Sequence, residues 1–147
     1  MPEPSQASIA GSEHNAVLQH AALLLRVFLI EDSVLLRNAL EEMLGELDRV
    51  ALVGSADTER DSLAGLEETT ADLVIVDLAL REGTGLGVLS ALAKAPERFH
   101  SPTAVVLSNH AYPQMRERCA RLGAAAFFDK SLQLPDLIEF IRARCGD

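Results

Sequence analysis

Five polar side chains in this sequence each follow an apolar segment. They are two adjacent acids, a third acid, a hydroxyl group and an amine, namely Glu31, Asp32, Asp77, Ser108 and Lys130. If the apolar segments are parallel strands, these side chains meet outside the carboxyl ends of the sheet, where such sheets bind ligands. The order and types of the five residues therefore predict a single polar site.

The expected chemistry of this site is magnesium-dependent phosphoryl transfer. Three crowded carboxylates repel one another unless a cation lies between them. Magnesium prefers oxygen ligands and keeps several waters, so two or three carboxylates and a backbone carbonyl suffice to bind it. An ammonium and a hydroxyl group beside the metal would hold phosphoryl oxygens, and a carboxylate at a strand end could attack the phosphorus.

Each residue taken alone has an ordinary structural explanation. Asp32 could cap the helix that follows it, and Asp77 could be a turn residue. Ser108 could be a cap or a solvated hydroxyl, and Lys130 a solvated surface charge. His110 is a loop histidine without a partner motif, so we expect it to be neither a metal ligand nor a general base. The joint placement after successive apolar segments favours the site.

The elements that must position these residues follow from hydrophobic periodicity. Expected strands cover residues 26–30, 50–56, 72–77, 103–108 and 124–128. Expected helices cover residues 33–46, 57–68, 86–94, 113–123 and 134–144. Apolar strands that alternate with helices predict an α/β fold, a doubly wound five-stranded parallel sheet with helices on both faces.

Length and composition narrow the functional classes. The 147 residues suit about one domain, and we expect a flexible tail over residues 1–23 before a domain over residues 24–147. A net charge of −9 opposes binding to nucleic acid. Neither a membrane span nor a signal peptide is expected. Cys119 and Cys145 lack metal-ligand spacing, so free thiols and a cytoplasmic location are expected.

The sequence resembles the receiver domain of two-component response regulators. The segments that carry the resemblance are residues 27–33, 73–78, 107–108 and 127–130. The intervals between Asp32, Asp77, Ser108 and Lys130 are 45, 31 and 22 residues, and they fit the family as well. The resemblance spans residues 24–145 and implies a flavodoxin-like fold.

The resemblance also implies a role for each site residue. Asp77 resembles the phosphoacceptor. Asp32 resembles the direct magnesium ligand and Glu31 an acid that acts mostly through a water, while the backbone carbonyl of Ala79 completes the protein ligands.

Four further residues take roles from the resemblance on the phosphoryl side of the site. Ser108 resembles the switch hydroxyl, and Lys130 the lysine that contacts the phosphoryl group. Phe127 occupies the position of the switch aromatic. Core packing would also explain Phe127, because Phe127 and Phe128 point to opposite faces of a strand. Asn109 follows the switch hydroxyl and is expected to border the phosphoryl group.

Several positions depart from the family's usual pattern. Ser131 follows the lysine, where the family usually has a proline in a cis bond, and a serine favours a trans bond. The loop 79–83 lacks the usual proline. Asn109 is bulkier than the usual small residue and is expected to narrow access to the site. Ala79 and His110 flank the path of the hydrolytic water, so they should tune the phosphoryl lifetime.

The sequence is thus expected to encode a single-domain response regulator with no enzymatic activity beyond its own phosphorylation and dephosphorylation. A sensor histidine kinase or histidine phosphotransfer protein would be the donor. The signal would leave by phosphorelay, or through an unknown downstream protein that contacts the fourth helix, fifth strand and fifth helix. Arg116, Arg118 and Arg121 on the fourth helix could dock that partner or form a solvated face.

Two other functions are alternatives to phosphoacceptance. A receiver-like module that binds partners without phosphorylation would not require the intact acids, hydroxyl and lysine. An aspartate-nucleophile phosphatase of the haloacid dehalogenase type also uses an aspartate, magnesium and a lysine. Such a phosphatase normally has a second acid two residues after the nucleophile, where this sequence has Ala79, and it is usually larger, with a cap domain.

Overall fold

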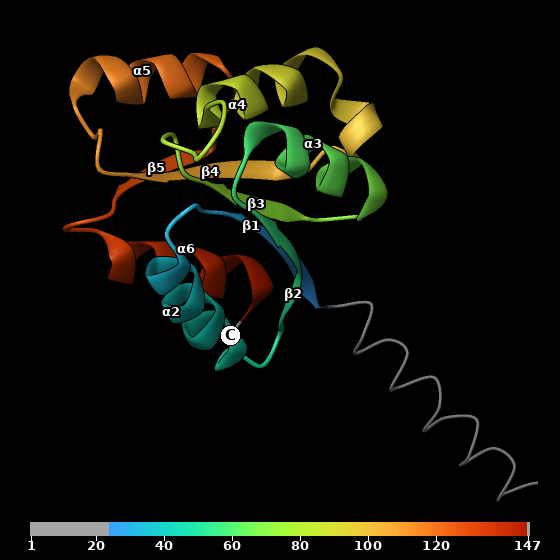
Figure 1. Cartoon of the computed structure of the whole chain (residues 1–147). Helices are drawn as coiled ribbons and strands as arrows, with labels where there is room; N and C mark the ends of the chain where they lie inside the picture. Colours follow the sequence, from blue (N-terminus) through green and yellow to red (C-terminus); the bar gives the residue numbers. More distant parts are fainter. Residues whose placement is uncertain (1–23, 147) are drawn as a thin grey trace, which may run out of the picture.

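The computed structural model describes residues 24–146, so the predicted tail over residues 1–23 lies outside the described residues. Strands and helices alternate along the described chain (Figure 1). The strands are β1 Leu25–Ile30, β2 Val50–Ala56, β3 Leu73–Val76, β4 Thr103–Ser108 and β5 Ala126–Asp129. The α-helices are α2 Val34–Gly45, α3 Glu59–Glu68, α4 Gly85–Lys94, α5 Pro113–Arg121 and α6 Leu134–Cys145. All the predicted elements are present with ends within two residues, whereas sequence analysis does not predict the 3-10 helix η1 Pro96–Phe99.

The five strands form one parallel sheet in the order β2-β1-β3-β4-β5. The chain runs outward from β1 to β2 and then returns to β3 on the other side of β1. The strand order therefore reverses between β1 and β3, and the carboxyl ends of these two strands flank the crevice where doubly wound sheets bind ligands. This confirms the predicted flavodoxin-like fold.

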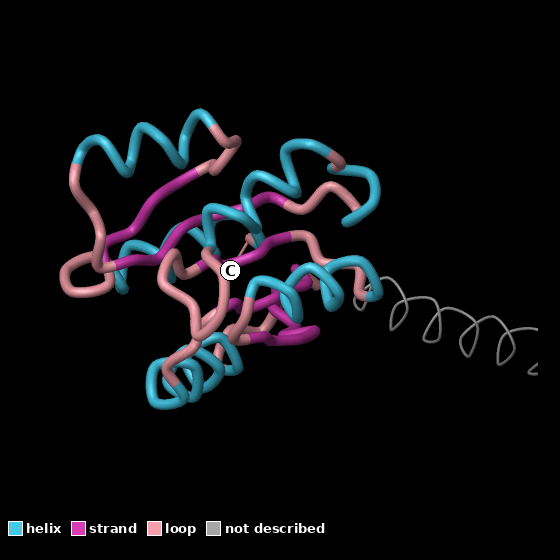
Figure 2. Tube along the Cα trace, turned by 45° about the horizontal axis from the view of Figure 1, so that its top comes forward, coloured by secondary structure: helices cyan, strands magenta, loops and turns pink. Residues whose placement is uncertain are grey.

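Helices cover both faces of the sheet, which lies between them as a central layer (Figures 1 and 2). One buried cluster joins the sheet to α3, α4 and α5, and includes Phe28 and Cys119. The other joins it to α2 and α6, and includes Leu29 and Phe128. Successive strand residues thus face opposite layers, which explains why the buried part of each strand is apolar on both sides.

Polar side chains fix the starts of three of the five described α-helices. The side chains of Ser33, Thr58 and Thr84 cap α2, α3 and α4 by accepting a hydrogen bond from a backbone N–H in the first turn. Since Ser33 caps α2, the alternative role of Asp32 as the cap is not what the structure shows. The Asp32 carboxylate is consequently available to the site.

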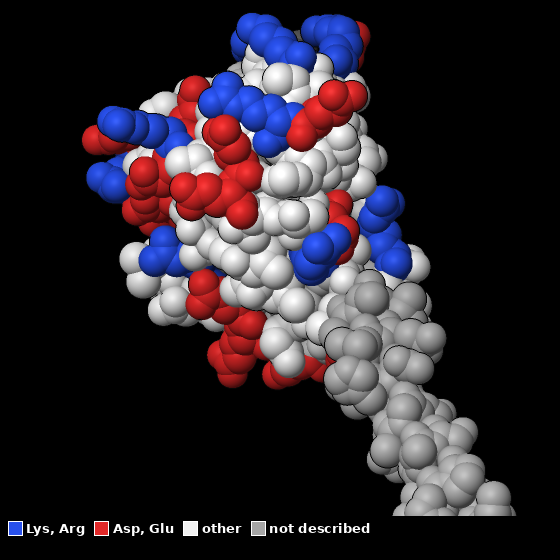
Figure 3. All heavy atoms as spheres, turned by 90° about the vertical axis from the view of Figure 1, so that its right-hand side faces the viewer, with Lys and Arg blue, Asp and Glu red and all other residues white. Residues whose placement is uncertain are grey.

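The two ends of the sheet differ in how their charges are arranged. At the amino ends of the strands, Arg26 pairs with Asp72 and Arg98 pairs with Glu67, each at about 3 Å. Basic and acidic side chains are interspersed on this face (Figure 3). Hydrogen bonds from Arg26 hold the pKa of Asp72 below its ordinary value. At the carboxyl ends, three acids instead lie close together.

The buried residues include one of two free thiols, in agreement with the cysteine prediction. Cys119 is fully buried between α5 and the sheet, whereas Cys145 is partly exposed. Burial raises the pKa of the Cys119 thiol. Within the described residues, no helix combines the length and apolar character that a membrane span requires.

Substitution of Gly85 tests how tightly the start of α4 packs against the backbone of Asp77 and Leu78. A Cβ at Gly85 would press on the Asp77 carbonyl oxygen and lie 2.8 Å from Leu78 Cα. We expect Gly85→Ala to lower the free energy of unfolding by about 1–3 kcal/mol in urea denaturation. A Cβ at Gly45 meets nothing within 4 Å, so Gly45→Ala should instead raise stability by up to about 1 kcal/mol. Equal effects of the two variants would contradict this packing argument.

Candidate functional site

Three acids meet at the reversal point of the sheet. Glu31 and Asp32 follow β1, and Asp77 follows β3. One carboxylate oxygen from each residue lies within 4.8 Å of the others. Glu31 and Asp77 are 1% and 3% exposed, while Asp32 is more accessible. The structure therefore brings together the acids that the sequence placed at one edge.

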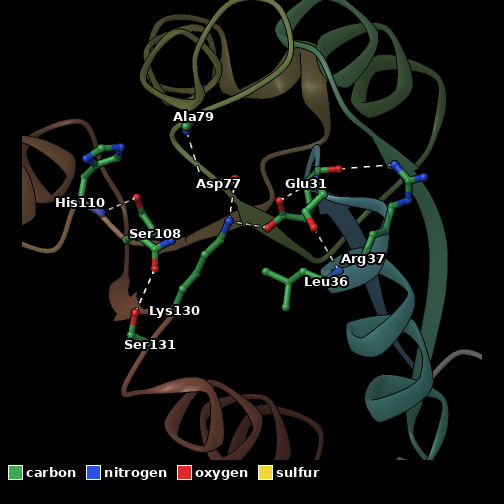
Figure 4. A network of polar contacts seen from close by, with 11 residues as sticks. Glu31, Leu36, Arg37, Asp77, Ala79, Ser108, His110, Lys130 and Ser131 are labelled. Atoms are coloured by element: carbon green, nitrogen blue, oxygen red, sulfur yellow. Dashed lines mark hydrogen bonds and ion pairs between the residues drawn. The ribbon is translucent and has the colours of Figure 1, made fainter.

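A single lysine forms an ion pair with each of the two buried acids of this cluster. The Lys130 Nζ lies 2.9 Å from Oε1 of Glu31 and 2.9 Å from Oδ2 of Asp77 (Figure 4). Burial lowers the pKa of Lys130, but its hydrogen bond to Asp77 and the negative charges of Asp77 and Glu31 outweigh this effect and raise the pKa above its ordinary value. Lys130 consequently remains an ammonium, so the solvated surface charge considered from sequence is not what the structure shows.

Backbone amides hold the two buried carboxylates in place. The Ser33 N–H donates to Oε2 of Glu31 at 3.0 Å, and the Ala79 N–H donates to Oδ1 of Asp77 at 3.3 Å. The remaining Glu31 oxygen, Oε1, is buried beside the ammonium but accepts no hydrogen bond of normal geometry. A buried carboxylate oxygen with spare acceptor capacity next to two other carboxylates fits a hard divalent cation such as magnesium.

Ser108 lies at the end of β4, beside Asp77, and is fully buried. Its Oγ accepts a hydrogen bond from the His110 backbone N–H at 3.1 Å, so the hydroxyl is bound within its own loop (Figure 4). Asn109 is exposed, and its Oδ1 accepts from the Ser131 hydroxyl at 3.2 Å. Sequence analysis does not predict either contact, because both join side chains to a loop whose path the periodicity leaves open.

Two loops around the site differ from the usual receiver pattern, as the sequence indicates. No peptide bond within residues 24–146 is cis, which confirms the trans bond predicted between Lys130 and Ser131. The loop after β3 is tied to the start of α3 instead of being stiffened by proline. Arg81 pairs with Asp57 through two bonds of 3.1 and 3.3 Å, and Glu59 accepts the Thr84 N–H at 3.0 Å.

Phe127 is half-buried and packs against the cluster formed with α3, α4 and α5. Phe128 points to the opposite cluster, as the alternation of the strand predicts. The Arg116 guanidinium lies 4.9 Å from the centre of the Phe127 ring. The three arginines of α5 therefore do not form one basic face, since Arg118 and Arg121 line a shallow groove against α4.

Arg116 is the residue of this region whose placement the sequence reasoning missed. One signal could have found it, because Arg116 precedes Cys119 by three residues and so shares the buried side of the helix.

An acidic crevice at the reversal point of a doubly wound parallel sheet, with a lysine from the last strand end, defines a receiver-like α/β module. Residues 27–142 match the family model described as the response regulator receiver domain. The match covers most of the chain, so the chain belongs to the response regulator receiver domain family.

Individual relatives agree with this family assignment. The response regulator GacA of Pseudomonas viridiflava is 26% identical over 119 residues, which cover 81% of this chain and 54% of GacA. The chain thus spans about half the length of the curated relatives it matches. The response regulator domain of Thermotoga maritima CheB has a similar fold, with a TM-score of 0.73 and 18% identity over 84% of this chain and 98% of that domain.

A second solved structure with a similar fold is a CheX–CheY–BeF3–Mg complex from Borrelia burgdorferi. Its TM-score is 0.72 at 17% identity, and the alignment covers 80% of this chain and 87% of that chain. At these identities the two structures support the fold alone.

Removing the Lys130 charge should destabilise the folded chain. Lys130→Met would leave Glu31 and Asp77 buried without a cation, and we expect a loss of about 2 kcal/mol or more in urea unfolding without magnesium. Magnesium should reduce this loss, because a divalent cation at the same carboxylates replaces the missing charge. Lys94, the only other lysine, is exposed, so Lys94→Met should change stability by less than about 0.5 kcal/mol. Equal losses in both variants would argue against the ion pairs.

The raised pKa of Lys130 also predicts an alkaline dependence of stability. The unfolded chain loses this proton near pH 10.4, at about the ordinary lysine value, whereas the folded chain keeps it to a higher pH. The stabilisation is therefore complete below that value and is lost as the pH rises through the folded pKa. Urea unfolding across this range should show wild type losing stability relative to Lys130→Met, and parallel curves would contradict the shift.

Proposed function

We propose that this chain is a phosphorylation-dependent response regulator with Asp77 as its phosphoacceptor. The observation that carries the proposal is the position of Asp77, whose buried carboxylate contacts the Lys130 ammonium at 2.9 Å inside a cluster of three acids. A phosphohistidine on a sensor histidine kinase or a histidine phosphotransfer protein would be the donor. A carboxylate oxygen of Asp77 attacks the phosphorus, the phosphorus–nitrogen bond breaks, and the imidazole leaves with the bonding electron pair.

The charges of the site suit this transfer. Asp32, Asp77 and the Ala79 backbone carbonyl would hold magnesium, with Glu31 acting mostly through a water. The bound ion would supply positive charge to the transferring phosphoryl group. Lys130 already lies beside the acceptor oxygen, and its ammonium can move from the carboxylates to a phosphoryl oxygen over a short path.

The response to phosphorylation would begin at Ser108. In this proposal its hydroxyl leaves the His110 N–H and donates to a phosphoryl oxygen, while Asn109 borders the same oxygens. The displacement of the β4 end and the new charge then change the packing of Phe127. The face formed by α5, β5 and α6 would carry the change to an unknown downstream protein, or the chain would pass its phosphoryl group onward in a phosphorelay.

The two alternative functions have less support. A phosphatase that uses an aspartate nucleophile needs an acid two residues later, and Ala79 is exposed there without a titratable group. A partner-binding module that is never phosphorylated would have no need to bury Glu31, Asp77 and Ser108 beside a lysine, because buried charges are costly to maintain. We therefore propose no enzymatic activity beyond the chain's own phosphorylation and dephosphorylation.

Asp77→Asn tests the phosphoacceptor directly. Wild type incubated with acetyl phosphate and magnesium should gain one phosphoryl group in intact-mass spectrometry, and Asp77→Asn should gain none because an amide cannot form the acyl phosphate. Asp48→Asn is a matched control, since Asp48 is exposed in a turn, and it should behave as wild type. Phosphorylation of Asp77→Asn at the wild-type rate would refute the assignment. Sustained phosphate release by wild type, many times per chain, would instead favour the phosphatase.

A further inference from the structure

We propose that Arg116 is a positioning residue that couples the loop carrying Lys130 to Phe127 and α5. The inference rests on the proposed function of Asp77 and Lys130. It assigns a mechanical role to a side chain that sequence analysis places on a basic face. The observations that carry it are three hydrogen bonds and one ring contact made by a single guanidinium group.

The Arg116 guanidinium joins α5 to three other segments of the chain. Its Nε donates to the Ala111 carbonyl at 3.2 Å, in the loop between β4 and α5. Its Nη1 donates to the Phe127 carbonyl of β5 at 3.1 Å, and its Cζ lies over the Phe127 ring, 4.9 Å from the ring centre. Its Nη2 donates to Oε1 of Gln133 at 2.8 Å, in the loop before α6.

Gln133 closes the loop that contains Lys130. Its Oε1 also accepts the Asp129 N–H at 3.0 Å, and its own N–H donates to the Asp129 carbonyl at 2.8 Å. The Lys130 N–H in turn donates to the Ser108 carbonyl at 3.1 Å. A displacement of Lys130 would therefore shift Gln133. The hydrogen bond between Gln133 and Arg116, the shortest of the three that Arg116 makes, would pass this shift to α5.

Ser131 explains why the loop that contains Lys130 needs the contact with Arg116. A serine at this position leaves the loop without the rigid ring that a proline would supply. Side-chain bonds shape it instead: the Ser131 N–H donates to Oδ1 of Asp129 at 2.8 Å, and the Ser131 hydroxyl donates to Asn109. Arg116 adds the contact that fastens this loop to the helix on the other side of β5.

An arginine is suited to this position for a geometric reason. Its planar fork presents donors in several fixed directions, whereas a lysine ammonium is a point charge on a flexible stem. The plane can also stack on an aromatic ring while its edge donates hydrogen bonds. Arg116 therefore fixes the Phe127 ring and the Gln133 loop relative to each other, in a geometry that the flexible ammonium of a lysine would not reproduce.

The test uses beryllofluoride with magnesium as a phosphoryl mimic on the 147-residue chain. Amide chemical shifts report the site at residues 77–79 and the response at residues 113–121. In wild type both groups should shift on addition of the mimic. In Arg116→Met and Arg116→Lys the site shifts should persist, while the α5 shifts should fall by more than half. Arg118→Met is the matched control, because Arg118 lines the groove against α4, and it should retain the wild-type response.

Gln133→Leu breaks the same link from the other end and should give the same loss in α5. This variant keeps the proposal testable if the Arg116 variants do not fold. Undiminished α5 shifts in folded Arg116→Met or Gln133→Leu would overturn the coupling but leave the proposed function intact. Absence of any shift at residues 77–79 in wild type would refute the proposed function, and the coupling with it.

Discussion

The ammonium of Lys130 between Glu31 and Asp77 is the interaction on which the rest of the site depends. Two carboxylates with almost no solvent exposure are costly unless a cation is held beside them. That cation is the residue directly after β5, and it reaches Asp77 across the carboxyl end of β4. The strand order therefore makes the two ion pairs possible, because it brings the ends of β1, β3 and β5 within reach of the Lys130 side chain.

The fold and the acidic cluster were predictable because both follow from the order of apolar and polar residues along the sequence. Apolar segments define the strands, and an acid, hydroxyl or amine directly after a strand has to lie at its carboxyl end. The strand boundaries were less predictable where an acidic residue directly precedes or follows the apolar segment. Asp72 and Asp77 were expected within the third strand, yet β3 ends short of both. Asp72 binds Arg26 at one end, and Asp77 belongs to the site at the other.

What the sequence did not predict are contacts between residues on different elements. The periodicity of α5 puts Arg116 near the buried side of the helix, but the partners Phe127 and Gln133 depend on how α5 packs beside β5. The loop after β3 is a similar case. Its lack of proline suggested a departure in shape, whereas the pairing of Arg81 with Asp57 depends on a neighbouring loop that no local pattern identifies.

The buried thiol of Cys119 has a consequence for how the chain withstands oxidants and alkylating reagents. Such reagents attack the thiolate, and the folded chain keeps Cys119 protonated and out of contact with solvent. The thiol therefore reacts only when α5 separates from the sheet, so its rate of modification measures the frequency of that opening. The helix that we propose responds to the state of Asp77 thus covers a natural reporter of its own local unfolding.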